Sequence, residues 1–191
     1  LMNKNLTINQ EAISIYLDCG YIPSPFSIYN EIQKLQPGYC MHIHLKEKKL
    51  YLEKYWDLQS VKVDESISYE TAKQKLHELI TDAVKIRMQS DVPLGSFLSG
   101  GIDSALVSAI AAKHSGQKLK TFTIAFEDSN FDESKVAEQY AQIINSEHTA
   151  TLCTPKEVLE MLPHLVNAYD EPFADSSALP SLLLNKVTKQ H

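Results

Sequence analysis

The chain has 191 residues and a formal net charge of −6, and 43% of its residues are hydrophobic. This length and composition can bury the core of one ordinary domain plus part of another, which excludes a wholly disordered chain. The acidic balance, without a stripe of lysine and arginine, argues against nucleic-acid binding.

The cysteines and the apolar runs bear on the compartment. Cys19, Cys40 and Cys153 are far apart and form no Cys-x-x-Cys pair. Such spacing is typical of reduced thiols, so we predict a cytoplasmic protein. The longest apolar run, 105–112, is much shorter than the roughly 20 residues of a membrane span, so we expect no membrane contact. A first residue other than methionine and a polar last segment lead us to expect a fragment.

The N-terminal part predicts one helix and one hairpin. Residues 9–20 begin with a good N-cap and end at glycine, which favours a short helix. Residues 39–45 and 50–56 alternate on either side of a charged tip, which predicts an antiparallel hairpin.

Two histidines, His42 and His44, fall on one face of the expected hairpin. Without a third ligand nearby in the sequence, a solvated strand face is favoured over a metal site.

A polar linker is expected at 57–67, followed by a helix at 68–88 with one apolar stripe, which consists of Ala72, Leu76, Leu79, Ile80, Ala83 and Val84. Near its end, Arg87 is expected to interact with the helix dipole, and a phosphate contact is the alternative.

The stretch that follows carries the chemistry. A short apolar segment ends in Ser99-Gly100-Gly101, and a helix is expected to begin at Asp103 or Ser104. Glycines without Cβ let backbone N–H groups approach an anion, and the N-terminus of a helix favours negative charge. We predict a pyrophosphate cradle in which both serines donate hydroxyls and Asp103 holds Mg²⁺.

Two common phosphate-binding patterns are absent from this loop. The Walker pattern requires a lysine and the dinucleotide-binding pattern requires a third glycine, and neither follows at the required spacing. An ordinary strand-to-helix turn with Asp103 as its N-cap is the remaining alternative to a pyrophosphate cradle.

The rest of the chain alternates between strand and helix. Strands are expected at 119–126 and 147–153, on either side of a helix that Asp132 caps. This order predicts an α/β fold with a parallel sheet and flanking helices, in which ligands bind beyond the carboxyl ends of the strands. Thr154 and Glu157 form a capping box for a helix that Pro163 is expected to bend or interrupt. Asp170, Glu171 and Asp175 either face a cation or substrate amine, or serve turns and caps.

Several segments together carry a resemblance. Ser-Gly-Gly-Ile-Asp-Ser at 99–104 is similar to the pyrophosphate motif of the N-type ATP pyrophosphatases. With Asp-Val-Pro-Leu-Gly at 91–95, Phe-Asp-Glu-Ser at 131–134 and Asp-Glu-Pro-Phe-Ala-Asp-Ser-Ser at 170–177, the chain resembles the glutamine-hydrolysing asparagine synthetase family.

The resemblance implies a division of the chain. Residues 1–56 correspond to the C-terminal remnant of an Ntn-type glutaminase domain, and residues 57–191 to the truncated N-terminal part of an adenine nucleotide alpha hydrolase-like synthetase domain. No cysteine here stands where the family has its glutaminase nucleophile, so no catalytic residue for glutamine hydrolysis is expected.

The resemblance also implies the activity. It is ATP-dependent amide formation from aspartate, or another carboxylate, and ammonia from glutamine, giving AMP and pyrophosphate. A β-lactam synthetase-like ligase with another acceptor and a non-catalytic nucleotide-binding module are the alternatives. The full-length family protein allows a homodimer, and the fragment alone is expected to be inactive. The expected contacts to ATP, with Mg²⁺ on Asp103, are Phe97, Leu98, Ser99, Gly100, Gly101, Ile102, Asp103, Ser104 and Ile124.

Overall fold

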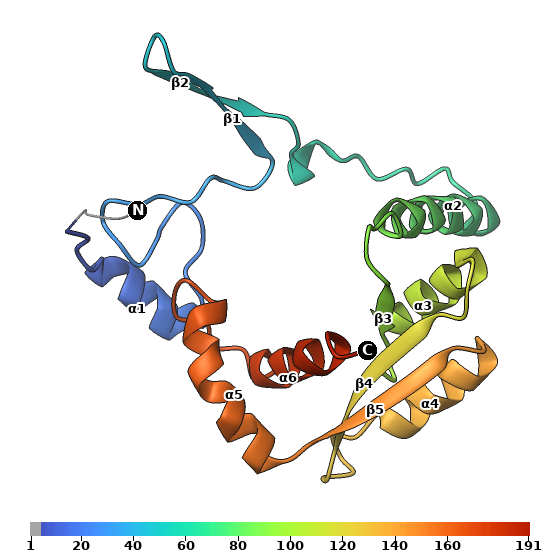
Figure 1. Cartoon of the computed structure of the whole chain (residues 1–191). Helices are drawn as coiled ribbons and strands as arrows, with labels where there is room; N and C mark the ends of the chain where they lie inside the picture. Colours follow the sequence, from blue (N-terminus) through green and yellow to red (C-terminus); the bar gives the residue numbers. More distant parts are fainter. Residues whose placement is uncertain (1–4) are drawn as a thin grey trace. The chain divides into compact units, whose positions relative to one another are not determined.

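The computed structural model describes residues 5–191, which divide into two compact units (Figure 1). One unit contains the chain up to Glu65 together with Val166–Asp175. The other contains Ser66–Leu165 together with Ser176–His191. No helix in the described part of the chain has both the length and the apolar content that crossing a bilayer requires.

The first unit contains the expected helix and hairpin. Helix α1, Gln10–Cys19, begins where the Asn9 side chain accepts a hydrogen bond from the amide of Ala12. It ends at Gly20, whose φ of 77° is left-handed and suits glycine. Strands β1, Tyr39–His44, and β2, Lys49–Lys54, pair antiparallel, and a short 3₁₀ helix, Leu58–Ser60, follows. The predicted helix and hairpin are therefore confirmed.

The second unit is built on a parallel sheet of three strands. These are β3, Gly95–Phe97, β4, Lys120–Phe126, and β5, Glu147–Cys153, in the order β3-β4-β5. Because β4 is paired along both sides, it is the centre of the sheet. The predicted α/β fold with a parallel sheet is confirmed for this unit.

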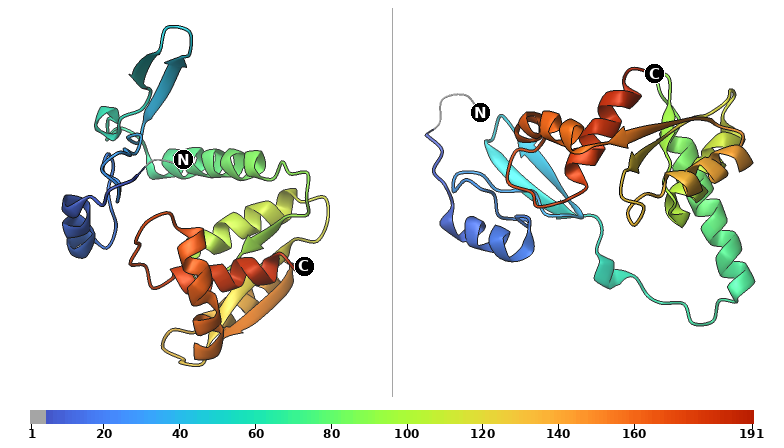
Figure 2. Two further views of the ribbon diagram at one scale, coloured as in Figure 1. Left: turned by 60° about the vertical axis from the view of Figure 1, so that its left-hand side comes forward. Right: turned by 90° about the horizontal axis from the view of Figure 1, so that it is seen from below.

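Helices cover both faces of this sheet. Helices α3 and α4 lie on one face and α6 lies on the other (Figures 1 and 2). Right-handed crossovers put the two helices that connect successive parallel strands on the same face, as observed. The helices of this unit are α2, Tyr69–Arg87, α3, Ile102–His114, α4, Ser134–Ile143, and α6, Ala178–Thr188, together with most of α5, Pro155–Ala168, whose residues from Val166 on belong to the first unit.

The two faces have separate cores. On one, Leu98 packs against Ala137 and Ala141 of α4. On the other, Cys153 packs against Met161 of α5 and Leu183 of α6. The end of β3 and the start of α6 are thus each fixed by their own apolar contacts.

Two expectations about helices need correction. The apolar stripe of α2 is buried only in its second half, where Ile80 and Val84 pack on α3, whereas Leu76 and Leu79 are exposed. Pro163 does not interrupt α5, which continues to Ala168, and the other alternative, a bend at Pro163, stays a prediction. Because proline has no N–H, the carbonyl of Leu159, four residues before Pro163, loses its helical amide partner. Leu159 is exposed, so water can reach that carbonyl.

Candidate functional site

The candidate site begins at the end of edge strand β3. Its first residue, Gly95, lies against the ring of Phe122 in β4, and a Cβ there would be 2.6 Å from Phe122 Cε2. The ladder continues one step beyond β3, where the Leu98 amide donates to the Phe122 carbonyl at 2.8 Å. Leu98 is 1% exposed, which fixes the direction in which the chain leaves the sheet.

The serine and glycine residues that follow make a compact loop. The hydroxyls of Ser99 and Ser104 lie 2.8 Å apart, and the Ser99 amide donates to Ser104 Oγ at 3.0 Å. The Gly101 amide donates to Ser99 Oγ at 3.2 Å. The two serines expected to donate to phosphate are therefore adjacent, on the same side of the turn into α3.

The glycines of this loop are needed for space. Among the described glycines, positive φ angles occur at Gly20 and Gly38, and Gly101 has a φ of −76°. A Cβ on Gly100 would lie 3.0 Å from Glu133 Cβ, which is tighter than ordinary contact. Close approach explains Gly100, and a left-handed conformation does not.

An anionic oxygen already lies on this loop. The amide of Gly100 donates a 3.0 Å hydrogen bond to Oε2 of Glu133, the residue that precedes α4. The backbone therefore presents an N–H that donates to a negatively charged group, which the predicted cradle requires.

Glu133 itself is positioned by its neighbour Asp132. The Asp132 carboxylate accepts from the amides of Phe126 and Ser134 and from the Ser134 hydroxyl. These hydrogen bonds, with that from the Ser134 side chain largest, hold the pKa of Asp132 below its ordinary value. Asp132 thus links the end of β4 to the start of α4. The residue at the N-cap of α4 is Glu133, so the prediction that Asp132 is the cap is wrong by one position.

A cavity of about 800 Å³ lies at the carboxyl ends of the strands. Its apolar part includes Phe97, which is 45% exposed, and Ile124, which packs on the α5–α6 core. Of the nine sequence-predicted contacts, those that line it are Phe97, Leu98, Ser99, Ser104 and Ile124. The remaining four, Gly100 to Asp103, form the turn between the two serines and do not line it. Because its side chain packs on α4, Leu98 can offer a ligand its backbone only.

Three acidic residues in this cavity were missed by sequence reasoning. Glu127, Asp128 and Glu133 all line it. The first two directly follow β4, and ligands bind beyond the carboxyl ends of parallel strands. That rule could have found them.

The predicted metal ligand, Asp103, lies in the first turn of α3 and is exposed. The N-cap of α3 is Gly101, so the alternative in which Asp103 caps the helix is wrong. Around Asp103, the described residues contain no group of three metal-ligating side chains. Magnesium is usually held by one or two carboxylates plus substrate phosphates and water, and a single carboxylate fits that pattern.

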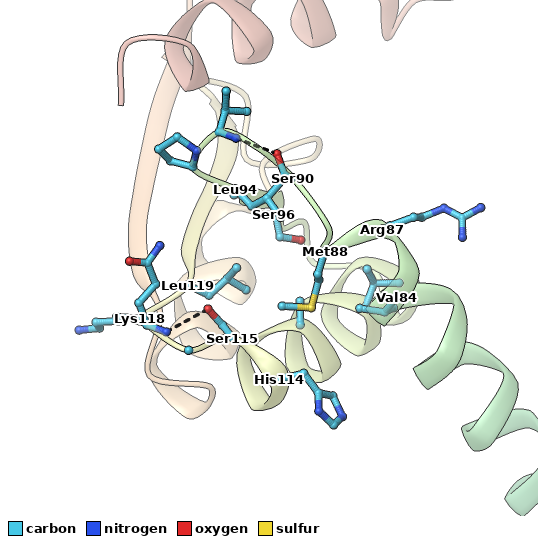
Figure 3. A pocket seen from close by; sticks show the side chains of 17 residues that line it. Val84, Arg87, Met88, Ser90, Leu94, Ser96, His114, Ser115, Lys118 and Leu119 are labelled. Atoms are coloured by element: carbon cyan, nitrogen blue, oxygen red, sulfur yellow. Dashed lines mark hydrogen bonds between the residues drawn. The ribbon is translucent and has the colours of Figure 1, made fainter.

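Arg87 is placed away from this cavity. It lines a second cavity of about 610 Å³, bordered by Leu94, His114 and Lys118 near the opposite ends of the strands (Figure 3). Its guanidinium points away from that cavity and donates to the carbonyl of Ala83 at 3.0 Å. Arg87 therefore serves the C-terminal end of α2, as expected.

Glu171 has a structural role within the first unit. Its carboxylate pairs with Lys34 and accepts from the amide of Ile28 at 3.1 Å. Neither alternative expected for the acidic segment at 170–175, a cation or substrate contact or a turn and cap role, describes these contacts of Glu171, which link it to another segment of the first unit.

Comparison with known proteins identifies the family. The Asparagine synthase family model matches residues 75–191, which include the whole candidate site. A Methanocaldococcus jannaschii protein named as glutamine-hydrolysing asparagine synthetase 2 is 33% identical over 192 residues, covering 99% of this chain and 36% of the relative. Asparagine synthetase 1 of Bacillus subtilis is 31% identical over 190 residues, covering 98% of this chain and 29% of the relative.

A relative with a different name also matches. Amidase chyE of Penicillium rubens is 32% identical over 131 residues, covering 60% of this chain and 19% of its own length. The chain spans about a third of the length of the first two relatives. The family model matches residues 75–191, which are more than half of the chain. The chain therefore belongs to the asparagine synthase family.

Proposed function

We propose that this chain is part of an asparagine synthetase-type ligase and that its second unit binds ATP. The pyrophosphate lies on the Ser99–Ser104 loop, and the adenine lies against Phe97 and Ile124. The hydrogen bond from the Gly100 amide to the Glu133 carboxylate carries this proposal, because it is an anion contact at the predicted phosphate position.

The proposed reaction proceeds in two steps. A carboxylate oxygen of aspartate attacks the α-phosphorus of ATP, and the bond to pyrophosphate breaks, which leaves an acyl-adenylate. Ammonia then attacks the acyl carbon, AMP leaves, and the amine proton passes to solvent.

The residues of this chain would bind and orient the leaving pyrophosphate. Backbone N–H groups and the two serine hydroxyls stabilise charge that develops on its oxygens. Mg²⁺, when bound by Asp103 and the phosphates, would supply further charge neutralisation. Within the same proposal, residues 1–56 belong to a glutaminase domain and residues 57–191 to an adenine nucleotide alpha hydrolase-like domain.

The proposal is tested by titrating the chain with ATP, with and without Mg²⁺. We expect saturable binding that strengthens with Mg²⁺, and Asp103→Asn should remove the strengthening while leaving binding of metal-free ATP. As a matched control, Asp82→Asn removes an exposed carboxylate of α2 and should change neither. Absence of ATP binding, with Asp103→Asn identical to the wild type, would favour a non-catalytic scaffold.

A ligase with another acceptor is the second candidate. It is favoured by the similarity to a Penicillium protein named as an amidase. Both candidates require ATP, so only the carboxylate differs. Assaying AMP release by the full-length protein with aspartate and with other carboxylates distinguishes them.

A further inference from the structure

The β1–β2 hairpin gathers three side chains of metal-ligand type on one face. In its antiparallel register Cys40 lies opposite Glu53, and His42 is two residues further along β1. Residues two apart on a strand, and residues directly opposite on its partner, project from the same face. The pleat of the hairpin thus brings a thiol, an imidazole and a carboxylate together.

The distances within this cluster are close to those of a metal site. Cys40 Sγ lies 3.5 Å from His42 Nε2, which lies 3.1 Å from Glu53 Oε2. All three ligand atoms lie within 4.8 Å of one another. In a tetrahedral zinc site with metal–ligand bonds of about 2.0–2.3 Å, ligand atoms are roughly 3.3–3.6 Å apart. Small side-chain adjustments would therefore suffice to bind an ion.

The sequence pattern pointed to a different pair on this strand. His44 shares a face with His42, as expected, but its ring meets the ring of Tyr51 edge-on, with centroids 5.5 Å apart. The two further ligands come from Cys40 and from across the hairpin, and a search for histidine pairs overlooks both. Within residues 5–191 no other group of three such side chains is as close.

We propose that Cys40, His42 and Glu53 bind one divalent ion of the zinc class, with water completing a tetrahedron. A thiolate together with an imidazole selects zinc over magnesium, which prefers oxygen ligands. The side chains of His42 and Glu53 are 54% and 66% exposed, so solvent reaches the open position. On binding, the Cys40 thiol gives its proton to solvent and its sulfur coordinates the ion. This site is independent of the proposed ATP site.

The test uses the chain under reducing conditions with Co²⁺ as a spectroscopic probe, followed by displacement with Zn²⁺. We expect one equivalent of Co²⁺ to give a sulfur-to-cobalt charge-transfer band that Zn²⁺ abolishes. Cys40→Ser should eliminate the band, and His42→Ala should weaken Zn²⁺ binding at least about tenfold, the smallest loss seen even for outer-shell partners.

Matched controls separate this site from other thiols and metal-binding groups. Cys19→Ser removes a different cysteine, which is exposed, His44→Ala removes the neighbouring histidine, and Asp103→Asn removes the proposed Mg²⁺ ligand. All three should keep the band and the affinity. Absence of the band in the wild type, its persistence in Cys40→Ser, or its loss in Cys19→Ser would overturn the proposal. Should Cys40→Ser not fold, as judged by circular dichroism, Glu53→Gln supplies the same test with the thiol intact and must weaken Zn²⁺ binding.

Discussion

Glu133 places a carboxylate oxygen 3.0 Å from the amide nitrogen of Gly100, where the proposed function puts a phosphate oxygen. The Glu133 carboxylate and a phosphate oxygen cannot both accept a full hydrogen bond from this one N–H. A bound nucleotide would therefore displace this side chain, which is exposed and makes no capping hydrogen bond to α4. At the residue scale, the proposed function thus makes Glu133 a competitor of the nucleotide for the Gly100 amide.

Replacing Glu133 with alanine should strengthen ATP binding about fivefold, because one hydrogen bond of roughly 1 kcal/mol no longer has to be broken. Isothermal titration calorimetry measures the affinity. The control is Glu138→Ala, which removes an equally exposed carboxylate from α4. Weaker ATP binding in Glu133→Ala would mean that this carboxylate contacts the nucleotide or its metal.

His148 in β5 makes stability depend on pH. Its Nδ1 lies 2.9 Å from Thr121 Oγ1, and its buried Nε2 has no hydrogen-bond partner. Burial lowers its pKa from the ordinary value of 6.5, and the nearby Glu138 partly opposes that shift. Below pH 6.5 the unfolded state therefore binds more protons at His148 than the folded state does. The contribution of neutral His148 to the free energy of unfolding is full above pH 6.5 and is lost as the pH falls below that value.

We therefore expect the urea midpoint to decrease between about pH 7 and pH 5.5, and His148→Gln to reduce that decrease. His164→Gln changes an exposed histidine of α5 and should leave the pH profile unchanged. An identical profile for wild type and His148→Gln would contradict the assignment.

At the scale of elements, the contact of β3 with β4 depends on a missing side chain. Gly95 pairs with Lys120 while its Cα faces the ring of Phe122, so any Cβ would collide with that ring. The sheet therefore needs glycine at the start of the strand that leads to the candidate cradle.

Gly95→Ala should destabilise the chain by about 1–3 kcal/mol, the usual range for overpacking, as measured by urea unfolding. Phe122→Leu should recover part of the loss when combined with it. Gly116→Ala is the matched control, since a Cβ there meets nothing within 4 Å. Equal effects of the two alanine substitutions would show that the ring moves aside freely.

Local signals in the sequence predicted elements well and contacts across elements less well. Asn9 and Gly20 marked the ends of α1, and Thr154 and Glu157 form the predicted capping box. These signals depend on neighbours in the chain. The exposure of Leu76 and the Glu133–Gly100 contact depend on which segments meet in space, and the sequence pattern does not encode that.

At the scale of the whole molecule, the described chain holds the loop that we propose binds phosphate and, beside it, the cavity of about 800 Å³ that we propose holds the nucleotide. By resemblance, the family has a second Ser-Gly-x-Gly-x-Asp-Glu segment and a later lysine near the phosphates. The Ser-Gly-x-Gly-x-Asp-Glu pattern does not occur in these 191 residues, which span 29% of the Bacillus subtilis relative.

We expect this chain alone to release no AMP, or nearly none, from ATP, Mg²⁺, aspartate and ammonia, even where it binds ATP. Thin-layer or chromatographic detection of AMP measures this, with the full-length protein as the positive control. Turnover by the chain at the rate of the full-length protein would contradict this prediction.

Strand β3, which leads into the proposed cradle, has the fewest paired residues in its sheet. Strand β3 has three residues and pairs with β4 alone among the described strands, whereas β4 has seven residues and pairs on both sides. Short edge strands open at low free-energy cost while the centre stays intact. Amide protons from Gly95 to Gly101 should then exchange with deuterium faster than those of β4, and ATP should slow them selectively. ATP binding would then order the segment that contacts the nucleotide.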